Sequence, residues 1–324
     1  MDFRLVELER WLGAQFPQVA FTLAPASADA SFRRYFRARL DDGRSFIAMD
    51  APPPQEDCAP FVRIAGLLRD AGLNAPEVLA QDLARGFLLL TDLGSTSFLQ
   101  ALREREPAPL FRDATDALLR WQAATRPGTL PPYDEALLRR ELDLFPEWYL
   151  ARHRGFAASD EQKNGLVKVF RLLLDSALAQ PRVYVHRDYM PRNLMVCEPN
   201  PGVLDFQDAV EGPISYDMAS LMRDAFISWE EEQVLDWTVR YWEKARKAGL
   251  PVDADFAAFW RAFEWMGLQR HLKVLGIFAR LNYRDGKPAY LADTPRFIGY
   301  ARAVAQRYVA LAPLARLLDA VEPA

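Results

Sequence analysis

The sequence of 324 residues contains few cysteines and histidines: two cysteines, Cys58 and Cys197, and three histidines. Because the two cysteines form no closely spaced pair, we expect neither a disulfide framework nor a structural zinc site. No stretch approaches the ~18 consecutive apolar residues that a membrane span requires. The N-terminal segment alternates charged and apolar residues, unlike a signal peptide. These absences predict a cytoplasmic protein without a membrane anchor.

The charge is nearly balanced. Forty Lys and Arg residues oppose 44 Asp and Glu residues, for a net charge of −4, which argues against a protein that binds nucleic acid through its phosphates. Half of the residues are hydrophobic and 12% are aromatic, a composition that excludes intrinsic disorder. The length allows one large domain or two of ordinary size.

The first ninety residues read as a small sheet with helices. Residues 2–16 place apolar side chains at helical spacing, and the turn Asp41-Asp42-Gly43-Arg44 separates two aromatic-rich runs, which predicts a β-hairpin. Further elements are expected at residues 61–73 (helix), 76–80 (strand) and 86–90 (strand).

The rest of the chain is mainly helical. Helices are expected at residues 97–105, 109–125, 133–152, 160–180, 216–226, 230–248, 253–281 and 295–318. Three short apolar runs between residues 183 and 207 interrupt them, and a Pro-rich turn at 198–202 joins the last two. We therefore predict an α+β, bilobal fold with a small β-rich N-lobe (residues 1–94) and a large helical C-lobe (95–324), with a ligand cleft between the lobes.

The most informative stretch is His186-Arg187-Asp188, followed after four intervening residues by Asn193 and, after the hairpin, by Asp205-Phe206. The hairpin should bring Asn193 and Asp205 to the same end, and Asp188 lies on the loop before it. Oxygen-bearing side chains of this kind suit Mg²⁺, which takes few protein ligands. A lone Asp–Asn pair usually serves only a turn, but the whole pattern matches the catalytic and metal loops of kinases.

With these motifs, the segments 89–94 and 212–217 complete a resemblance to the aminoglycoside-phosphotransferase-like small-molecule kinases, which share the bilobal protein-kinase-like fold. Within that group, segments 46–53 and 269–281 resemble those of the bacterial anomeric kinases that act on N-acetylmuramate and N-acetylglucosamine in peptidoglycan recycling. The resemblance implies a kinase that uses ATP and Mg²⁺ and phosphorylates the anomeric hydroxyl of an amino sugar. We expect the protein to act on small molecules as a monomer.

The resemblance also implies roles for particular residues. Asp188 would orient the sugar hydroxyl or accept its proton, and Asn193 and Asp205 would hold Mg²⁺ against the ATP phosphates. The backbone of Thr91, Asp92 and Leu93 would meet the adenine edge.

One position departs from the kinase pattern, because the strand that normally carries a phosphate-binding lysine has Met49 instead. Arg33 and Arg34, in the segment 31–37, are the candidate replacements, and strand alternation lets only one of them face the nucleotide.

Substrate contacts are expected from Arg223, Asp224 and Arg270, since a carboxylate-bearing sugar would give an arginine a partner. An internal salt bridge from Arg270 to a buried acid explains that residue equally well. Asp217, at the start of a helix, is expected to brace the catalytic loop.

Two alternatives stay open at this point. The acceptor could be another small alcohol, such as an aminoglycoside, choline or homoserine, although Arg223 and Arg270 suit a polycation poorly. The chain could also be a degenerate, nucleotide-binding pseudokinase, for which Met49 is the only support.

Overall fold

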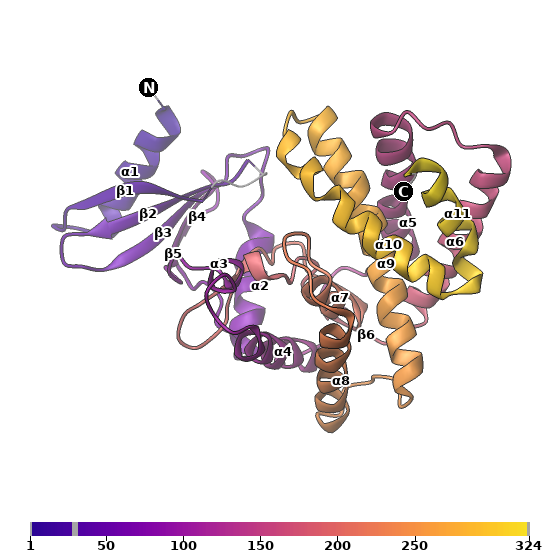
Figure 1. The fold of residues 1–324 in the computed structure, drawn as a ribbon. Coiled ribbons are helices and arrows are strands. Elements are labelled where there is room, and N and C mark those ends of the chain that lie inside the picture. Colours follow the sequence, from indigo (N-terminus) through magenta and orange to yellow (C-terminus); the bar gives the residue numbers. More distant parts are fainter. Residues whose placement is uncertain (1, 28–31, 323–324) are drawn as a thin grey trace. The chain divides into compact units, whose positions relative to one another are not determined.

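The computed structural model describes residues 2–27 and 32–322 (Figure 1). The chain forms two compact units. The first unit comprises Met1–Trp121 and Pro191–Asp208, and the second comprises Gln122–Met190 and Ala209–Ala324. Each unit is described separately below, and the lobe boundary at residue 94 stays a prediction.

The first unit is built on an antiparallel five-stranded sheet with the order β1-β2-β3-β5-β4. Its strands are β1 (Phe21–Ser27), β2 (Arg34–Leu40), β3 (Ser45–Asp50), β4 (Val78–Asp82) and β5 (Phe87–Thr91). The predicted hairpin between β2 and β3 is confirmed. Its turn places Gly43 at a φ of +89°, a conformation that glycine adopts without the steric cost of a Cβ atom.

The two faces of the sheet have different partners because side chains alternate along each strand. Helix α1 (Phe3–Gln15) packs Leu8, Trp11 and Leu12 against one face, where they form a core with alanine, leucine and phenylalanine side chains of β2, β3 and β5. On the other face, side chains of β2, β3 and β5 line a cavity together with Phe61 of helix α2 (Ala59–Asp70). The sheet thus separates a hydrophobic core from a candidate ligand site.

Two helices and a small hairpin complete the first unit. Helix α3 (Phe98–Ala101) is shorter than expected and begins at a capping box formed by Ser97 and Gln100. Helix α4 (Pro107–Ala123) reaches the unit boundary. The hairpin consists of β7 (Leu194–Met195) and β8 (Gly202–Val203), and a 3₁₀ turn, η2 (Pro191–Asn193), precedes it.

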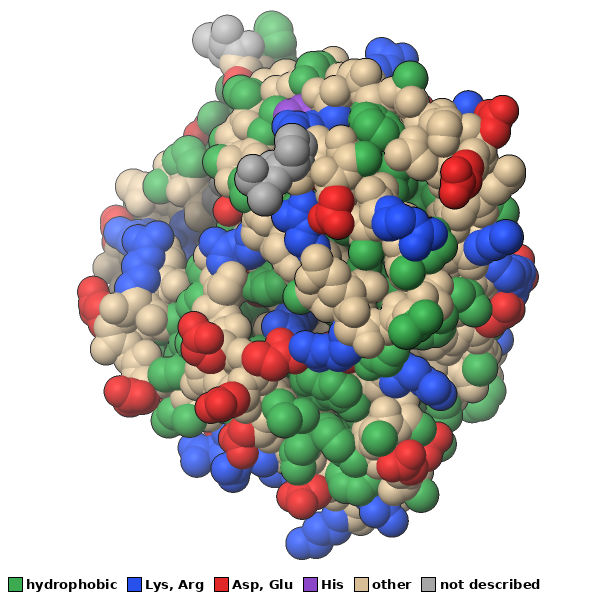
Figure 2. Space-filling view, turned by 45° about the vertical axis from the view of Figure 1, so that its right-hand side comes forward, with side chains coloured by type: hydrophobic (Ala, Val, Ile, Leu, Met, Phe, Trp, Pro, Cys, Tyr) green, Lys and Arg blue, Asp and Glu red, His purple; other side chains and the backbone are tan. Residues whose placement is uncertain are grey.

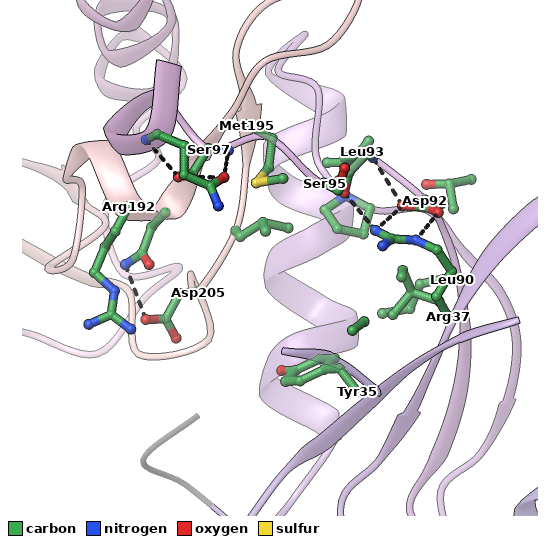
Figure 3. A pocket seen from close by; sticks show the side chains of 18 of the residues that line it. Tyr35, Arg37, Leu90, Asp92, Leu93, Ser95, Ser97, Arg192, Met195 and Asp205 are labelled. Atoms are coloured by element: carbon green, nitrogen blue, oxygen red, sulfur yellow. Dashed lines mark hydrogen bonds and ion pairs between the residues drawn. The ribbon is translucent and has the colours of Figure 1, made fainter. Parts of the chain in front are cut away.

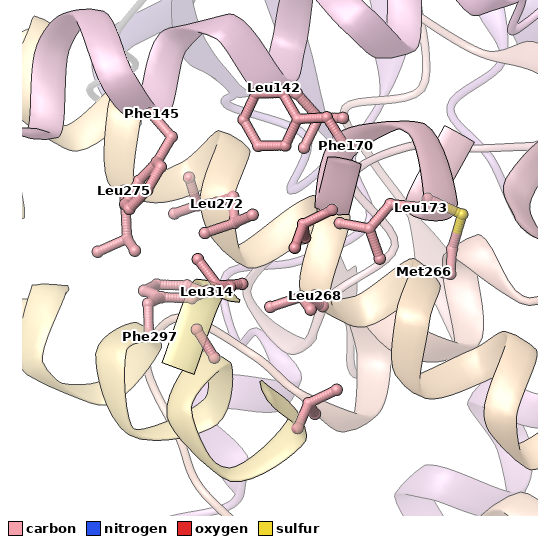
Figure 4. Packing of buried hydrophobic residues seen from close by; sticks show 14 of the residues in the cluster. Leu142, Phe145, Phe170, Leu173, Met266, Leu268, Leu272, Leu275, Phe297 and Leu314 are labelled. Carbon is pink, nitrogen blue, oxygen red and sulfur yellow. The ribbon is translucent and has the colours of Figure 1, made fainter. Parts of the chain in front are cut away.

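The second unit is a helical bundle around the long helix α9 (Figure 4). Its helices are α5 (Glu135–Leu144), η1 (Phe145–His153, π-helical), α6 (Asp160–Leu178), α7 (Tyr216–Met222), α8 (Glu231–Lys247), α9 (Phe256–Tyr283), η3 (Pro288–Asp293), α10 (Thr294–Arg307), η4 (Val309–Leu311) and α11 (Ala312–Val321). The unit also contains a two-stranded antiparallel sheet of β6 (Arg182–Val185) and β9 (Val210–Pro213), two strands that come between α6 and α7 in the sequence. Leucines of α9 pack against Phe145, Phe170 and Phe297, so α9 forms the centre of this core.

Besides α3, which is shorter than predicted, and α7, which ends at Met222 rather than at 226, two helix predictions are wrong at their boundaries. The single helix expected at 295–318 is two helices, since Pro313 lacks the N–H that a helix interior needs and is accommodated in the first turn of α11. The helix expected at 133–152 starts at Glu135 and continues from Phe145 as a π-helix.

The N-terminal part of the chain is rich in strands and the remainder is mainly helical, as predicted. Within the described ranges, none of the helices is long and apolar enough to cross a membrane. On the face that Figure 2 shows, Lys and Arg side chains are interspersed with Asp and Glu side chains, in keeping with the balanced charge.

Candidate active site

The first unit contains a cavity of about 330 Å³ on the face of the sheet opposite α1 (Figure 3). It is lined by strand residues, by the segment that follows β5, and by both arms of the β7–β8 hairpin. The lining residues are Ala26, Tyr35, Arg37, Ile47, Phe61, Pro76, Leu90, Thr91, Asp92, Leu93, Gly94, Ser95, Ser97, Gln100, Arg192, Asn193, Met195, Leu204 and Asp205. The structure therefore places Thr91, Asp92, Leu93, Asn193 and Asp205 around one cavity.

The predicted convergence of Asn193 and Asp205 is confirmed. The Leu204 N–H donates to the Asn193 carbonyl (2.9 Å), which closes the hairpin end, and the Asn193 side-chain amide donates to Asp205 Oδ2 (3.2 Å). The Gln207 side chain donates to Asp205 Oδ1 (2.9 Å). Asp205 has a φ of +63°, and this left-handed conformation is costly for a residue other than glycine. Such strain at a cavity-lining carboxylate favours a functional role.

This pair is chemically suited to a magnesium ion. The carboxylate of Asp205 and the amide oxygen of Asn193 are hard oxygen donors, and both residues line the cavity. Among the residues that the structure describes, no group of three or more His, Cys, Asp or Glu side chains gathers as a metal cage. A donor set this small fits Mg²⁺, which completes its coordination with water and phosphate oxygens.

The segment after β5 is held by the side chain of Asp92. Its carboxylate accepts hydrogen bonds from Arg37 Nε (2.7 Å), Ser45 Oγ (2.6 Å) and the Gly94 N–H (3.0 Å). Burial alone would raise the pKa of Asp92, but these three donors outweigh it and hold the pKa below its ordinary value. Within the described part of the chain, the main-chain N–H and C=O of Leu93 have no hydrogen-bond partner. They are available to a planar ligand edge.

The two arginines predicted to bind the phosphates, Arg33 and Arg34, do not line the cavity. Arg34 lies outside the cavity lining, and its guanidinium binds Asp50 (2.9 Å from Nε to Oδ2) and Asp2. Arg33 forms a salt bridge with Glu56 (3.0 Å) and is also absent from the lining. Ser31, the first residue of the segment expected to cover the phosphates, lies outside the described residues. Met49 is fully buried, in register with Tyr35 of β2.

In the second unit, Asp217 at the start of α7 braces the loop that carries Asp188, as predicted. Its carboxylate accepts hydrogen bonds from the main-chain N–H groups of His186 (2.7 Å) and Arg187 (3.0 Å). Burial raises the pKa of Asp217 to about 7 against the lowering effect of these two hydrogen bonds, while the charge of Asp188 adds to the rise and that of Arg270 opposes it. Both charges therefore lie within electrostatic reach of Asp217.

A buried ion cluster around Glu141 supports the same loop and was not predicted. Glu141 of α5 accepts hydrogen bonds from Arg187 Nη2 (2.7 Å), Lys273 Nζ (2.9 Å), Gln269 Nε2 (3.3 Å) and the Tyr133 hydroxyl. Arg187 has a left-handed φ of +75° and directly precedes Asp188. Arg187 is part of the sequence motif, but its acidic partner Glu141 lies 46 residues earlier in the chain. The motif alone therefore gave no signal of this ion pair.

The structure brings Arg223, Asp224 and Arg270 together in the second unit. Asp224 is fully buried, its Oδ1 accepts from the Ala225 N–H (2.7 Å), and its Oδ2 has no partner among the described residues. Burial raises the pKa of Asp224 to about 6 against the opposing charge of Arg270. Arg270 is 2% exposed, and its Nη1 likewise has no partner within the described part of the chain, whereas Arg223 donates to Glu231 (2.7 Å).

The five-stranded sheet, its cavity, and the pair of Asn193 and Asp205 at the β7–β8 hairpin are together the features of a phosphoryl-transfer enzyme. The model of the phosphotransferase enzyme family matches residues 22–256, and the chain belongs to that family. Among solved structures, a choline/ethanolamine kinase family protein from Mesorhizobium loti has a TM-score of 0.65 at 16% identity, covering 97% of this chain and 100% of that one. An ADP-bound aminoglycoside phosphotransferase has a TM-score of 0.59 at 14% identity, covering 93% and 98%. The predicted kinase-like α+β fold is confirmed.

Two curated relatives are much more similar in sequence. The N-acetylmuramate/N-acetylglucosamine kinase of Pseudomonas aeruginosa is 53% identical, covering 98% of this chain and 96% of its own length. The protein of the same name from Neisseria meningitidis is 51% identical, covering 97% and 95%. The predicted resemblance to this group of small-molecule kinases is confirmed.

Proposed function

We propose that this protein is an ATP- and Mg²⁺-dependent kinase that phosphorylates the anomeric hydroxyl of N-acetylmuramate and N-acetylglucosamine. The sugar 1-phosphates would return to cell-wall synthesis in peptidoglycan recycling. The observation that carries the proposal is the 53% identity, along almost the whole chain, to a kinase named for these two sugars. Identity of this extent supports a shared substrate class.

The cavity of the first unit supports the nucleotide part of the proposal. The unpartnered N–H and C=O of Leu93 are suited to pairing with the adenine edge, while Asp92 holds the segment and Thr91 begins it. Asn193 and Asp205 would hold Mg²⁺ at the other end of the lining. Mg²⁺, when bound, neutralises the negative charge that develops on the leaving diphosphate.

In the proposed reaction, Asp188 aims the acceptor. Its carboxylate accepts a hydrogen bond from the anomeric hydroxyl and takes the proton as the sugar oxygen bonds to the γ-phosphorus. The bond between that phosphorus and the bridging oxygen breaks, and its electron pair leaves on ADP. Because the transition state is loose, orientation of the hydroxyl matters more than strong basicity. Asp217 and the Glu141 cluster supply a rigid support for the loop.

The acceptor site is proposed around Asp224 and Arg270. A buried polar atom without a partner costs free energy, so the unpaired Asp224 Oδ2 and Arg270 Nη1 favour a polar ligand there. A sugar hydroxyl would donate to Asp224, and the lactyl carboxylate of N-acetylmuramate would accept from Arg270. Arg223, already bonded to Glu231, fits a supporting role beside them.

The test is a coupled assay of ADP release with the purified full chain, Mg²⁺ and a panel of acceptors. N-acetylmuramate and N-acetylglucosamine should support turnover, and their 1-deoxy and 1-O-methyl analogues should not. Phosphate at carbon 6, or on either analogue, would disprove the anomeric assignment. Turnover only with choline, homoserine or an aminoglycoside would establish another small alcohol as the acceptor. Tight ATP binding without turnover on any acceptor would identify a pseudokinase.

A further inference from the structure

The cavity of the first unit has one arginine and one carboxylate at each end. The described residues that line it include two arginines, Arg37 and Arg192, and two carboxylates, Asp92 and Asp205. Arg37 and Asp92 form a salt bridge (2.7 Å) beside the segment that follows β5, so their charges offset each other at that end. Arg192 and Asp205 belong to the opposite end, at the β7–β8 hairpin (Figure 3).

That end is where a phosphate chain would need positive charge. ATP brings several negative charges next to the Asp205 carboxylate, and one divalent cation offsets only part of them. Met49 is a thioether with no charge, Arg34 is engaged by Asp50 and Asp2, and Arg33 is paired with Glu56. None of these three side chains lines the cavity.

The local structure directs Arg192 toward the cavity. Arg192 is the middle residue of the 3₁₀ turn η2, whose first residue, Pro191, has a φ fixed by its ring. Pro191 and Asn193 are buried, whereas Arg192 is exposed and lines the cavity. The next residue, Asn193, donates to Asp205 (3.2 Å), so the turn sets the guanidinium at the Asp205 end.

We infer that Arg192 donates hydrogen bonds to phosphate oxygens of the nucleotide and replaces the strand lysine whose place Met49 occupies. A guanidinium presents a planar fork of N–H donors that matches two phosphate oxygens at once. The inference rests on the proposed function, since it assigns one residue of the nucleotide site. It moves the phosphate contact from the sheet to the loop that also carries Asn193.

The experiment compares Arg192→Gln, Arg192→Lys and the wild-type full chain by titration calorimetry with adenosine, ADP and ATP. The ADP and ATP titrations are run in EDTA and again in excess Mg²⁺. A lost charged hydrogen bond should weaken ADP and ATP binding by about 10- to 150-fold in Arg192→Gln. Adenosine affinity should not change, and Arg192→Lys should retain part of the phosphate affinity. Arg103→Gln is the matched control, because Arg103 is exposed in the same unit and does not line the cavity.

Three results would overturn the inference: ADP affinity of Arg192→Gln equal to wild type, an equal loss with adenosine, or a loss that appears only with Mg²⁺. An equal loss with adenosine would mean that Arg192 maintains the turn, and a Mg²⁺-dependent loss would mean that it supports the metal ligands. Failure of the wild-type protein to bind adenosine or ATP would instead refute the proposed nucleotide site as a whole.

Discussion

Replacing Glu141 by glutamine should destabilise the second unit strongly, because it removes a negative charge from between two buried cations. Glu141 is 5% exposed and accepts from Arg187 and Lys273 at 2.7 and 2.9 Å. Burial would raise its pKa, but Lys273 and Arg187, with the Tyr133 hydroxyl, lower the pKa from 4.5 to about 2. A fall of this size corresponds to about 3 kcal/mol of stability. Breaking a buried ion pair by removing one partner costs a similar ~3–5 kcal/mol.

The sign of the pH dependence follows from the lowered pKa. The stabilising contribution of Glu141 is fully present above pH 4.5, the ordinary pKa, and is lost as the pH falls towards 2. The groups that face this carboxylate are Lys273, Arg187, Gln269 and the Tyr133 hydroxyl, and both cations keep their charge throughout that range. The wild-type free energy of unfolding should therefore fall by about 3 kcal/mol more than that of Glu141→Gln between pH 4.5 and 2.

The assay is urea unfolding followed by circular dichroism, at pH 7 and across that acidic range. Glu135→Gln is the control, since Glu135 lies on the same helix and its salt bridge with Arg171 is exposed. Such a surface pair contributes at most about 1 kcal/mol. A loss at pH 7 no larger in Glu141→Gln than in Glu135→Gln would refute the reasoning, as would identical acid profiles for wild type and Glu141→Gln.

Three further variants test the proposed chemistry. Asp188→Asn should lower turnover by about 10²–10⁴ with little change in ATP affinity, measured by initial rates and calorimetry; near-normal turnover would remove Asp188 from the mechanism. Asp205→Ala should weaken binding of Mg·ATP, with only partial recovery in excess Mg²⁺, and unchanged binding would show that the metal ligands are wrongly assigned. Arg270→Met should reduce kcat/KM for N-acetylmuramate more than for N-acetylglucosamine, whereas equal losses would make Arg270 structural.

Local patterns in the sequence predicted much of the framework correctly. Residues 2–16 show the periodicity of α1, and Gly43 between two aromatic-rich runs predicts the β2–β3 hairpin. Asn193 and Asp205 are 12 residues apart at the two ends of a short hairpin, so sequence spacing alone brings these two side chains together. Each of these features depends on neighbours within about ten to twenty residues, which is why it is legible without the fold.

Other elements depended on distant partners. Strand β1 contains Pro25 and has little strand pattern of its own, but it forms the edge of the sheet by pairing with β2. The break before α11 had a local signal in Pro313, which the apolar periodicity of residues 295–318 obscured.

The sequence by itself determined the kinase motif, the residues of the loop and the absence of a strand lysine at Met49. Only the tertiary structure decided which arginine lies where. Side chains alternate on a strand, so Arg34 lies outside the cavity lining while Arg37 lines it, and that choice depends on how β2 is placed between its neighbours. The partner of Arg187 was likewise set by packing, because Glu141, Gln269 and Lys273 meet only where α5 lies against α9.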